Sequence, residues 1–85
     1  MYVEFLGIPR ERAGVSQVEI EAETLGQLLG VLVARFPTFG DLISDAGALH
    51  PSVAANLNGD EFVNRPETPL AVDDHVLILS ADVGG

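Results

Sequence analysis

One amphipathic helix in a chain of only 85 residues most restricts the possible folds. Thr24, with Gln27 three residues later, is typical of a capping box at a helix start, and Pro37 ends the pattern. The apolar residues in between recur at helical spacing and form one stripe: Leu25, Leu28, Leu29, Leu32 and Phe36. Such a helix has one apolar surface to cover, so the rest of the chain is expected to supply a sheet.

Alternating apolar and polar residues predict the strands of that sheet. The first is expected over residues 2–8 and the second over 18–21, with the charged segment 9–14 as a long hairpin loop. Arg10 and Arg12 in this loop could bind a carboxylate or phosphate, but charged loop residues more often lie in solvent, and that is the expectation here.

The second half of the chain predicts a hairpin and a final strand. Segment 39–50 mixes apolar residues with glycine and aspartate, which indicates a helical turn and an irregular loop. Asn58-Gly59 is a strong hairpin signal, because both residues accept the positive φ of a type I′ turn. Three further strands are expected over 53–57, 61–63 and 75–79.

The predicted order is β-β-α-β-β-β, an α+β domain with one main helix on a mixed sheet of about five strands. The first and last strands can then lie side by side and project the tail from one end of the sheet. A ferredoxin-like fold is the alternative, but it requires a second full helix, which segment 39–50 is too short to supply. We expect one domain over 1–80 and a flexible tail over 81–85.

Composition excludes several classes of function. The chain contains no cysteine, which excludes disulfides and thiolate metal sites. It has no basic segment followed by an apolar one and no run of about 18 apolar residues, so we expect a cytoplasmic protein that does not cross a membrane. Thirteen acidic residues and four basic ones, all arginine, give a net charge of -9. That charge disfavours nucleic acid and anionic lipid and favours a basic protein surface as partner.

No metal or cofactor site is expected within the chain. Asp73-Asp74-His75 offers at most three ligands in poor geometry for a metal ion. Neither a phosphate-binding glycine motif nor an internal acid-base constellation is present.

The C-terminal segment loses bulk after the last apolar strand and ends at Gly84-Gly85. Residues without a Cβ allow a chain to enter a narrow channel and bring its backbone against a reacting atom. The pattern fits a functional tail, and an idle, disordered terminus is the alternative.

Several short motifs occur in a particular order: an opening strand, Arg10-Glu11-Arg12-Ala13-Gly14, the helix ending in Phe36-Pro37, Leu57-Asn58-Gly59, Pro69-Leu70 and Val83-Gly84-Gly85. Together they resemble the ubiquitin-like β-grasp sulfur carriers, the family of the small subunit of molybdopterin synthase (MoaD) and the thiamine-pathway carrier (ThiS). The resemblance covers essentially the whole chain. Two departures are visible. Asp74 stands where a left-handed glycine is common, and Ser80-Ala81 stand where prolines are common.

The resemblance implies a carrier that is a substrate, or the small subunit of a synthase, rather than an enzyme. The Gly85 carboxylate would be adenylated by an ATP-using enzyme similar to ubiquitin E1, and a sulfur donor would convert it to a thiocarboxylate. The tail, with Val83 and Gly84, would then enter the large subunit of a MoaE-like synthase, with molybdopterin as the first expectation. The alternatives are thiamine or cysteine pathways, a protein modifier joined through Gly85, and a non-covalent interaction domain.

Both faces of the last strand are apolar, which predicts a docking surface. We expect Val76 and Ile78 beneath the helix, and Leu77 and Leu79 with Leu6 on the far face, where they would bind the partner. The alternative is that loops or a second copy of the chain cover this face.

Overall fold

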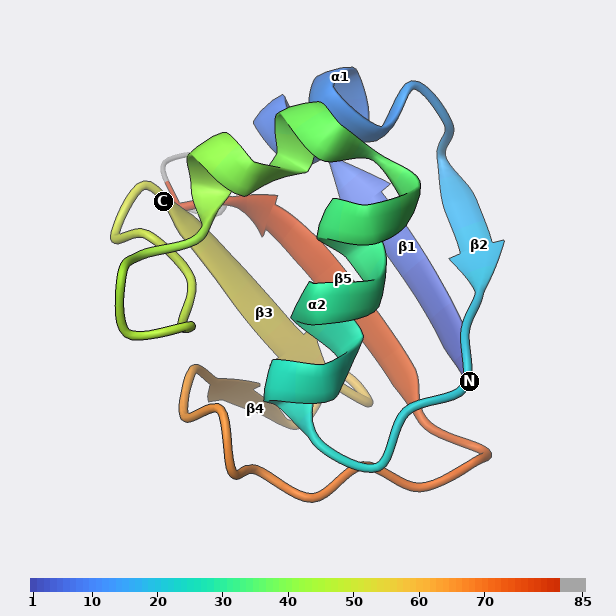
Figure 1. Ribbon diagram of the computed structural model, residues 1–85. Coiled ribbons are helices and arrows are strands. Elements are labelled where there is room, and N and C mark those ends of the chain that lie inside the picture. The colour runs from blue at the N-terminus through green and yellow to red at the C-terminus, as the bar shows by residue number, and fades with distance from the viewer. Residues whose placement is uncertain (82–85) are drawn as a thin grey trace.

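The computed structural model describes residues 1–81, which form one sheet and the helices packed on it (Figure 1). The elements in chain order are β1 (Tyr2–Leu6), α1 (Ile8–Ala13), β2 (Gln17–Glu19), α2 (Leu25–Arg35), the 3-10 helix η1 (Pro37–Leu42), β3 (Val53–Leu57), β4 (Glu61–Val63) and β5 (His75–Ser80). The strands lie in the order β2-β1-β5-β3-β4. β1 and β5 are parallel and the other neighbours antiparallel, which confirms the predicted mixed five-stranded sheet.

Helix α2 begins and packs as its sequence predicts. The Thr24 hydroxyl accepts a hydrogen bond from the Gln27 backbone N–H at 3.2 Å, which satisfies one of the free donors of the first turn. The Gln27 side chain accepts from the N–H of Glu23 at 2.8 Å, one residue earlier than in a standard capping box. The buried residues of its apolar stripe, which pack against the sheet, are Leu25, Leu28, Leu29 and Leu32.

The sheet contributes its inner face to the same core. Figure 1 shows α2 and η1 on one side of the sheet. The side chains beneath them are at most 2% exposed and include Val3, Phe5, Ala55, Val76 and Ile78. This confirms the predicted faces of β1 and β5, because the residues between these positions point to the other side.

Residues 9–13 of the predicted loop 9–14 belong to the helix α1, so the prediction of a loop there is wrong. Pro9 lies in the first turn, where its missing N–H costs no hydrogen bond. Gly14 ends the helix in the left-handed conformation (φ 76°), and its N–H donates to the Arg10 carbonyl at 2.9 Å. Pro9 near the start and Gly14 just past the end are the sequence features that could have predicted this helix.

Arg12 binds a carboxylate, which was the alternative to a solvated side chain, and so joins α1 to η1. Its guanidinium lies 3.0 Å from a carboxylate oxygen of Asp41, and its carbonyl accepts from the Thr38 hydroxyl at 2.8 Å. The ion pair is exposed, so its contribution to stability is small. The contacts nevertheless fix where the short helix lies.

The two hairpins are confirmed with adjusted ends. The first pairs β1 with β2, but β1 ends at Leu6 and β2 covers only Gln17–Glu19. The second turns at Asn58 and Gly59, whose φ angles of 57° and 73° are both positive, as a type I′ turn requires.

No helix in residues 1–81 is long and apolar enough to cross a membrane.

Asp74, which stands where a left-handed glycine is common in the family that the sequence resembles, does not adopt the left-handed conformation. Among residues 1–81, Asn58 is the one non-glycine residue with positive φ. The Asp74 carboxylate instead accepts hydrogen bonds from the Ala71 N–H at 2.7 Å and the Asn58 amide at 3.0 Å. These two bonds, the first above all, lower the pKa of Asp74.

This lowered pKa predicts a pH dependence of stability. A carboxyl whose pKa is lower in the folded state stabilises the fold above its unfolded pKa, and that contribution is lost as pH falls through the folded pKa. We expect Asp74→Asn to destabilise the protein at pH 7 and to flatten the loss of melting temperature in acid. Thermal unfolding between neutral pH and about pH 2, below the ordinary aspartate pKa, measures this. The neighbouring exposed Asp73→Asn is the matched control, and equal curves for both variants would contradict the assignment.

Candidate functional site

The tail leaves the sheet from its central strand. β5 lies between β1 and β3, and Ser80, its last residue, is 2% exposed. The Ser80 hydroxyl accepts a hydrogen bond from the Ile8 N–H at 2.7 Å, and the Ala81 N–H donates to the Ser52 carbonyl at 2.8 Å. The base of the tail is therefore held on both sides.

Ser80 also supplies the cap that α1 lacks locally. Gly7 precedes this helix and has no side chain to accept from its first N–H groups, so the hydroxyl at the end of β5 takes that role. The sequence showed Ser80 only as a departure from proline. Its partner lies 72 residues away in sequence, and no local pattern could have revealed the contact.

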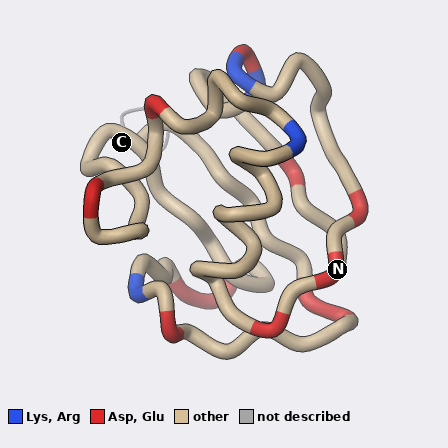
Figure 2. Tube along the Cα trace, in the orientation of Figure 1, with Lys and Arg blue, Asp and Glu red and all other residues tan. Residues whose placement is uncertain are grey.

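Three residues proposed for the chemistry, Val83, Gly84 and Gly85, lie outside the described residues. What the structure provides is the position of the residue from which they extend. Figure 2 shows the two arginines of α1 at one end of the molecule, whereas acidic residues gather around the end that contains the N-terminus.

The face of the sheet turned away from α2, here the outer face, brings the predicted docking residues together. β1 and β5 pair in register, so that Leu6 lies opposite Leu79 and Glu4 opposite Leu77. Residues opposite each other in adjacent strands have neighbouring side chains. The predicted grouping of Leu6, Leu77 and Leu79 on this face is therefore confirmed in position.

The exposure of these three leucines differs from the expectation. Leu6 is 41% exposed and Leu77 is half-buried, but Leu79 is only 9% exposed. Leu79 lies on the central strand between Leu6 of β1 and Ala54 of β3, whose side chains flank it. It is thus not the exposed anchor that the sequence predicted.

Phe62 belongs to the same face and was missed by the sequence analysis. Its side chain is 68% exposed and lies opposite Asn56, which in turn lies opposite Leu77. A hollow of about 300 Å³ beside it extends to Ala81, at the base of the tail. Successive side chains of a strand point to opposite faces of the sheet, and this alternation could have indicated the position of Phe62. Val63 packs against the core, so its neighbour Phe62 must point to the outer face. We call Leu6, Phe62 and Leu77 the outer-face patch.

Polar residues border this patch at the end of the sheet away from the tail. The Nε2 atom of His75 lies 3.0 Å from a carboxylate oxygen of Glu4, with both side chains about half exposed. The Tyr2 ring packs edge-on against His75 at 4.6 Å between centroids. In the described part of the chain, no three acidic or histidine side chains are placed to hold a metal ion.

Comparisons with known proteins place this geometry in a family. The model of the ThiS family matches residues 3–85, whereas a search of curated proteins found no match. Mycobacterium tuberculosis CysO is 30% identical, with 94% of this chain and 97% of that chain covered and a TM-score of 0.78. The match to the Amycolatopsis orientalis BexX/CysO complex has 24% identity and a TM-score of 0.81, and it covers 99% of this chain and 98% of that chain. The match to Haloferax volcanii SAMP1 also has 24% identity, with a TM-score of 0.76, and it covers 100% of this chain and 98% of that chain.

These structures share the ubiquitin-like β-grasp fold, with a mixed sheet against one main helix, as the sequence predicted. The family match extends over both the sheet and the terminal glycines. The chain is thus a member of the ThiS family, with the fold of the ubiquitin-like sulfur carriers and modifiers.

Proposed function

We propose that this chain carries sulfur as a thiocarboxylate on Gly85. The observation that supports this most directly is the family match through the terminal Gly84-Gly85, which extend from a tail base anchored at Ser80 and Ala81. A rigid base with a thin tip suits entry into a narrow channel, where a Cβ would clash. The groups that catalyse the reaction belong to the partner enzymes.

The proposed chemistry begins with activation of a carboxylate, which resists nucleophiles because it is anionic. An E1-like enzyme binds ATP, and the Gly85 carboxylate attacks its α-phosphorus, forming an acyl adenylate and releasing pyrophosphate. Sulfide, or the terminal sulfur of a persulfide donor with two electrons from a thiol, then replaces AMP and leaves the thiocarboxylate. This chain itself is proposed to bind no cofactor.

The proposed acceptor is a synthase subunit that takes the tail into its active site. A MoaE-like large subunit that makes molybdopterin is the first proposal, and thiamine or cysteine pathways are the variants. The neighbouring CysO structure in complex with BexX supports docking of a protein of this shape to a partner. Ala81, which is exposed at the base of the tail where prolines are common in the family, is proposed as a feature by which acceptors discriminate.

A protein modifier is the second candidate, because several neighbours are small archaeal modifier proteins. In that case Gly85 would form an isopeptide bond with a lysine of another protein. The chain has no lysine of its own, so it could not form side-chain-linked chains of copies.

Intact-mass measurement separates these candidates. The full chain is incubated with an activating enzyme, ATP and a sulfur donor, and separately in a cell extract. One oxygen-to-sulfur exchange at the C-terminus supports sulfur carriage, and adducts on lysines of other proteins support modification. If cognate enzymes produce neither, the proposal is wrong and a non-covalent interaction domain is favoured.

The outer-face patch is proposed to dock the partner beside the tail. We expect Leu6→Asp and Phe62→Asp each to weaken binding of the activating enzyme by about 2 kcal/mol, as an interface anchor would. Both side chains are exposed, so the stability of the free protein should change little. Titration calorimetry measures the affinity, and thermal unfolding serves as the check on stability.

Val72→Asp is the matched control, because Val72 is 74% exposed but lies in the loop before β5, at the end of the sheet away from the tail. Unchanged affinity in the two patch variants would contradict the docking surface. Leu79→Asp is the poorer test, since a charge at a 9% exposed position would also destabilise the fold.

A further inference from the structure

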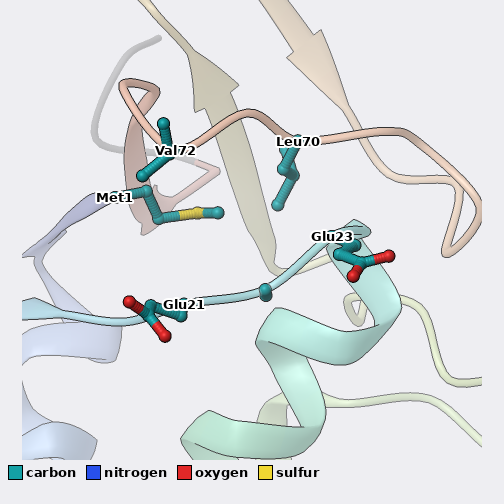
Figure 3. Close-up of a pocket in the computed structure, with 6 residues that line it drawn as sticks. Met1, Glu21, Glu23, Leu70 and Val72 are labelled. Atoms are coloured by element: carbon teal, nitrogen blue, oxygen red, sulfur yellow. The ribbon is translucent and has the colours of Figure 1, made fainter.

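A second surface lies at the end of the sheet opposite the tail. A hollow of about 260 Å³, here the N-terminal hollow, is lined by Met1, Glu21, Ala22, Glu23, Leu70 and Val72. In Figure 3 the Met1 side chain extends toward Leu70, with Val72 beside it, and segment 21–23 forms the opposite wall. None of these residues takes part in the outer-face patch or the tail base.

The centre of this hollow is apolar and partly exposed. Met1 and Leu70 are 5% and 9% exposed and form its inner wall, whereas Val72 is 74% exposed, the largest value among the large apolar residues of 1–81. An apolar group of a partner that covers Val72 and this wall removes apolar area from water, which stabilises the complex by about 25 cal/mol per Å². A partner with an aliphatic side chain therefore fits here.

The border of the hollow is acidic. In Figure 3 the carboxylates of Glu21 and Glu23 point outward from the two ends of their segment. Neither forms an ion pair with any residue in 1–81, although Arg12 and Arg65 each pair with another acid. Asp73 follows Val72 directly, and Figure 2 shows acidic residues gathered around this end. The Met1 ammonium is already paired with Glu19 and the Ile20 carbonyl, so the remaining charge favours a cationic partner and disfavours an acidic one.

From this combination we infer a second docking surface, whose occupant is a protein segment with an aliphatic side chain flanked by lysine or arginine. The aliphatic group would contact Met1, Leu70 and Val72, and the cations would lie against Glu21 and Glu23. β5 runs for six residues between this end and the tail, roughly 20 Å of strand. A bound segment would thus leave Gly84-Gly85 free to enter an active site.

A peptide titration of the isotope-labelled full chain, followed by NMR, tests this inference. The probe is a short synthetic peptide of alternating lysine and leucine, compared with peptides in which glutamate replaces lysine or serine replaces leucine. We expect saturable shifts at the amides of Ala22, Glu23 and Val72 with the first peptide alone. Deleting Gly84-Gly85 should leave the affinity unchanged, which separates this surface from sulfur transfer.

Variants with matched controls identify the contacts. Val72→Ser should raise the dissociation constant roughly fivefold, and Glu21→Gln with Glu23→Gln should raise it by a similar factor and reduce its salt dependence. Val15→Ser and Glu61→Gln, both at exposed positions elsewhere, should change neither. The inference is overturned if the acidic peptide binds equally well, if no shift saturates, if shifts centre on the outer-face patch, or if control and test variants weaken alike.

Discussion

A variant that lacks Gly85 is expected to fold normally and to accept no sulfur at all. The proposed reaction occurs at the Gly85 carboxylate, and shortening the tail by one residue withdraws the new terminus from the reacting centre. Every residue of the described core precedes Ser80, so thermal stability should stay within error. Intact mass after incubation with activating enzyme, ATP and sulfur donor measures the loss, and thermal unfolding confirms the fold.

A chain with one residue added after Gly85 is the companion variant. It keeps both glycines but displaces the carboxylate, so it should be equally inactive. Restoration of cofactor synthesis in cells by either variant would refute the role of Gly85. Loss of stability in the deletion variant would instead show that the tail contributes to the fold.

Ser80→Ala is expected to cost about 1–3 kcal/mol of unfolding free energy, because it leaves the Ile8 N–H without its acceptor. The hydroxyl is enclosed at 2% exposure, so the lost bond is not simply replaced by one to solvent. Urea unfolding measures the change in free energy. Faster amide hydrogen exchange at Ile8 should locate it at the start of α1.

Ser52→Ala is the matched control for this prediction. Ser52 also lies beside the tail base, but it holds Ala81 through its backbone carbonyl, which the substitution retains. Its side chain is exposed and contacts His50. Equal stability losses in the two variants would show that the Ser80 hydroxyl has no special role.

Much of the fold could be predicted because its signals are local. The stripe of α2 repeats at helical spacing, Asn58-Gly59 marks its turn, and alternation placed Val3 and Phe5 on one face of the first strand, which is the buried one. Each of these patterns depends on residues within a few positions of one another. The topology followed because one helix can cover one face of one sheet.

The errors arose where distant segments decide the structure. One of the two hydrogen bonds to the Asp74 carboxylate comes from Asn58 in the β3–β4 hairpin, and Leu79 is covered by neighbours on two other strands. Neither arrangement leaves a trace in the neighbouring sequence. Helix α1 is different, because Pro9 and Gly14 indicate its two ends in the sequence. Its six residues are too few to show apolar residues recurring at helical spacing.

The central position of β5 also has a consequence for how the chain folds. β5 separates the β1–β2 hairpin from the β3–β4 hairpin, and its parallel partner β1 comes from the other end of the sequence. Such distant pairing slows folding, because a long loop must close before any contact compensates for the lost entropy. The sheet is continuous only after the tail-bearing strand has inserted. An enzyme that recognises the assembled outer face would therefore select fully folded chains and leave unfinished ones unmodified.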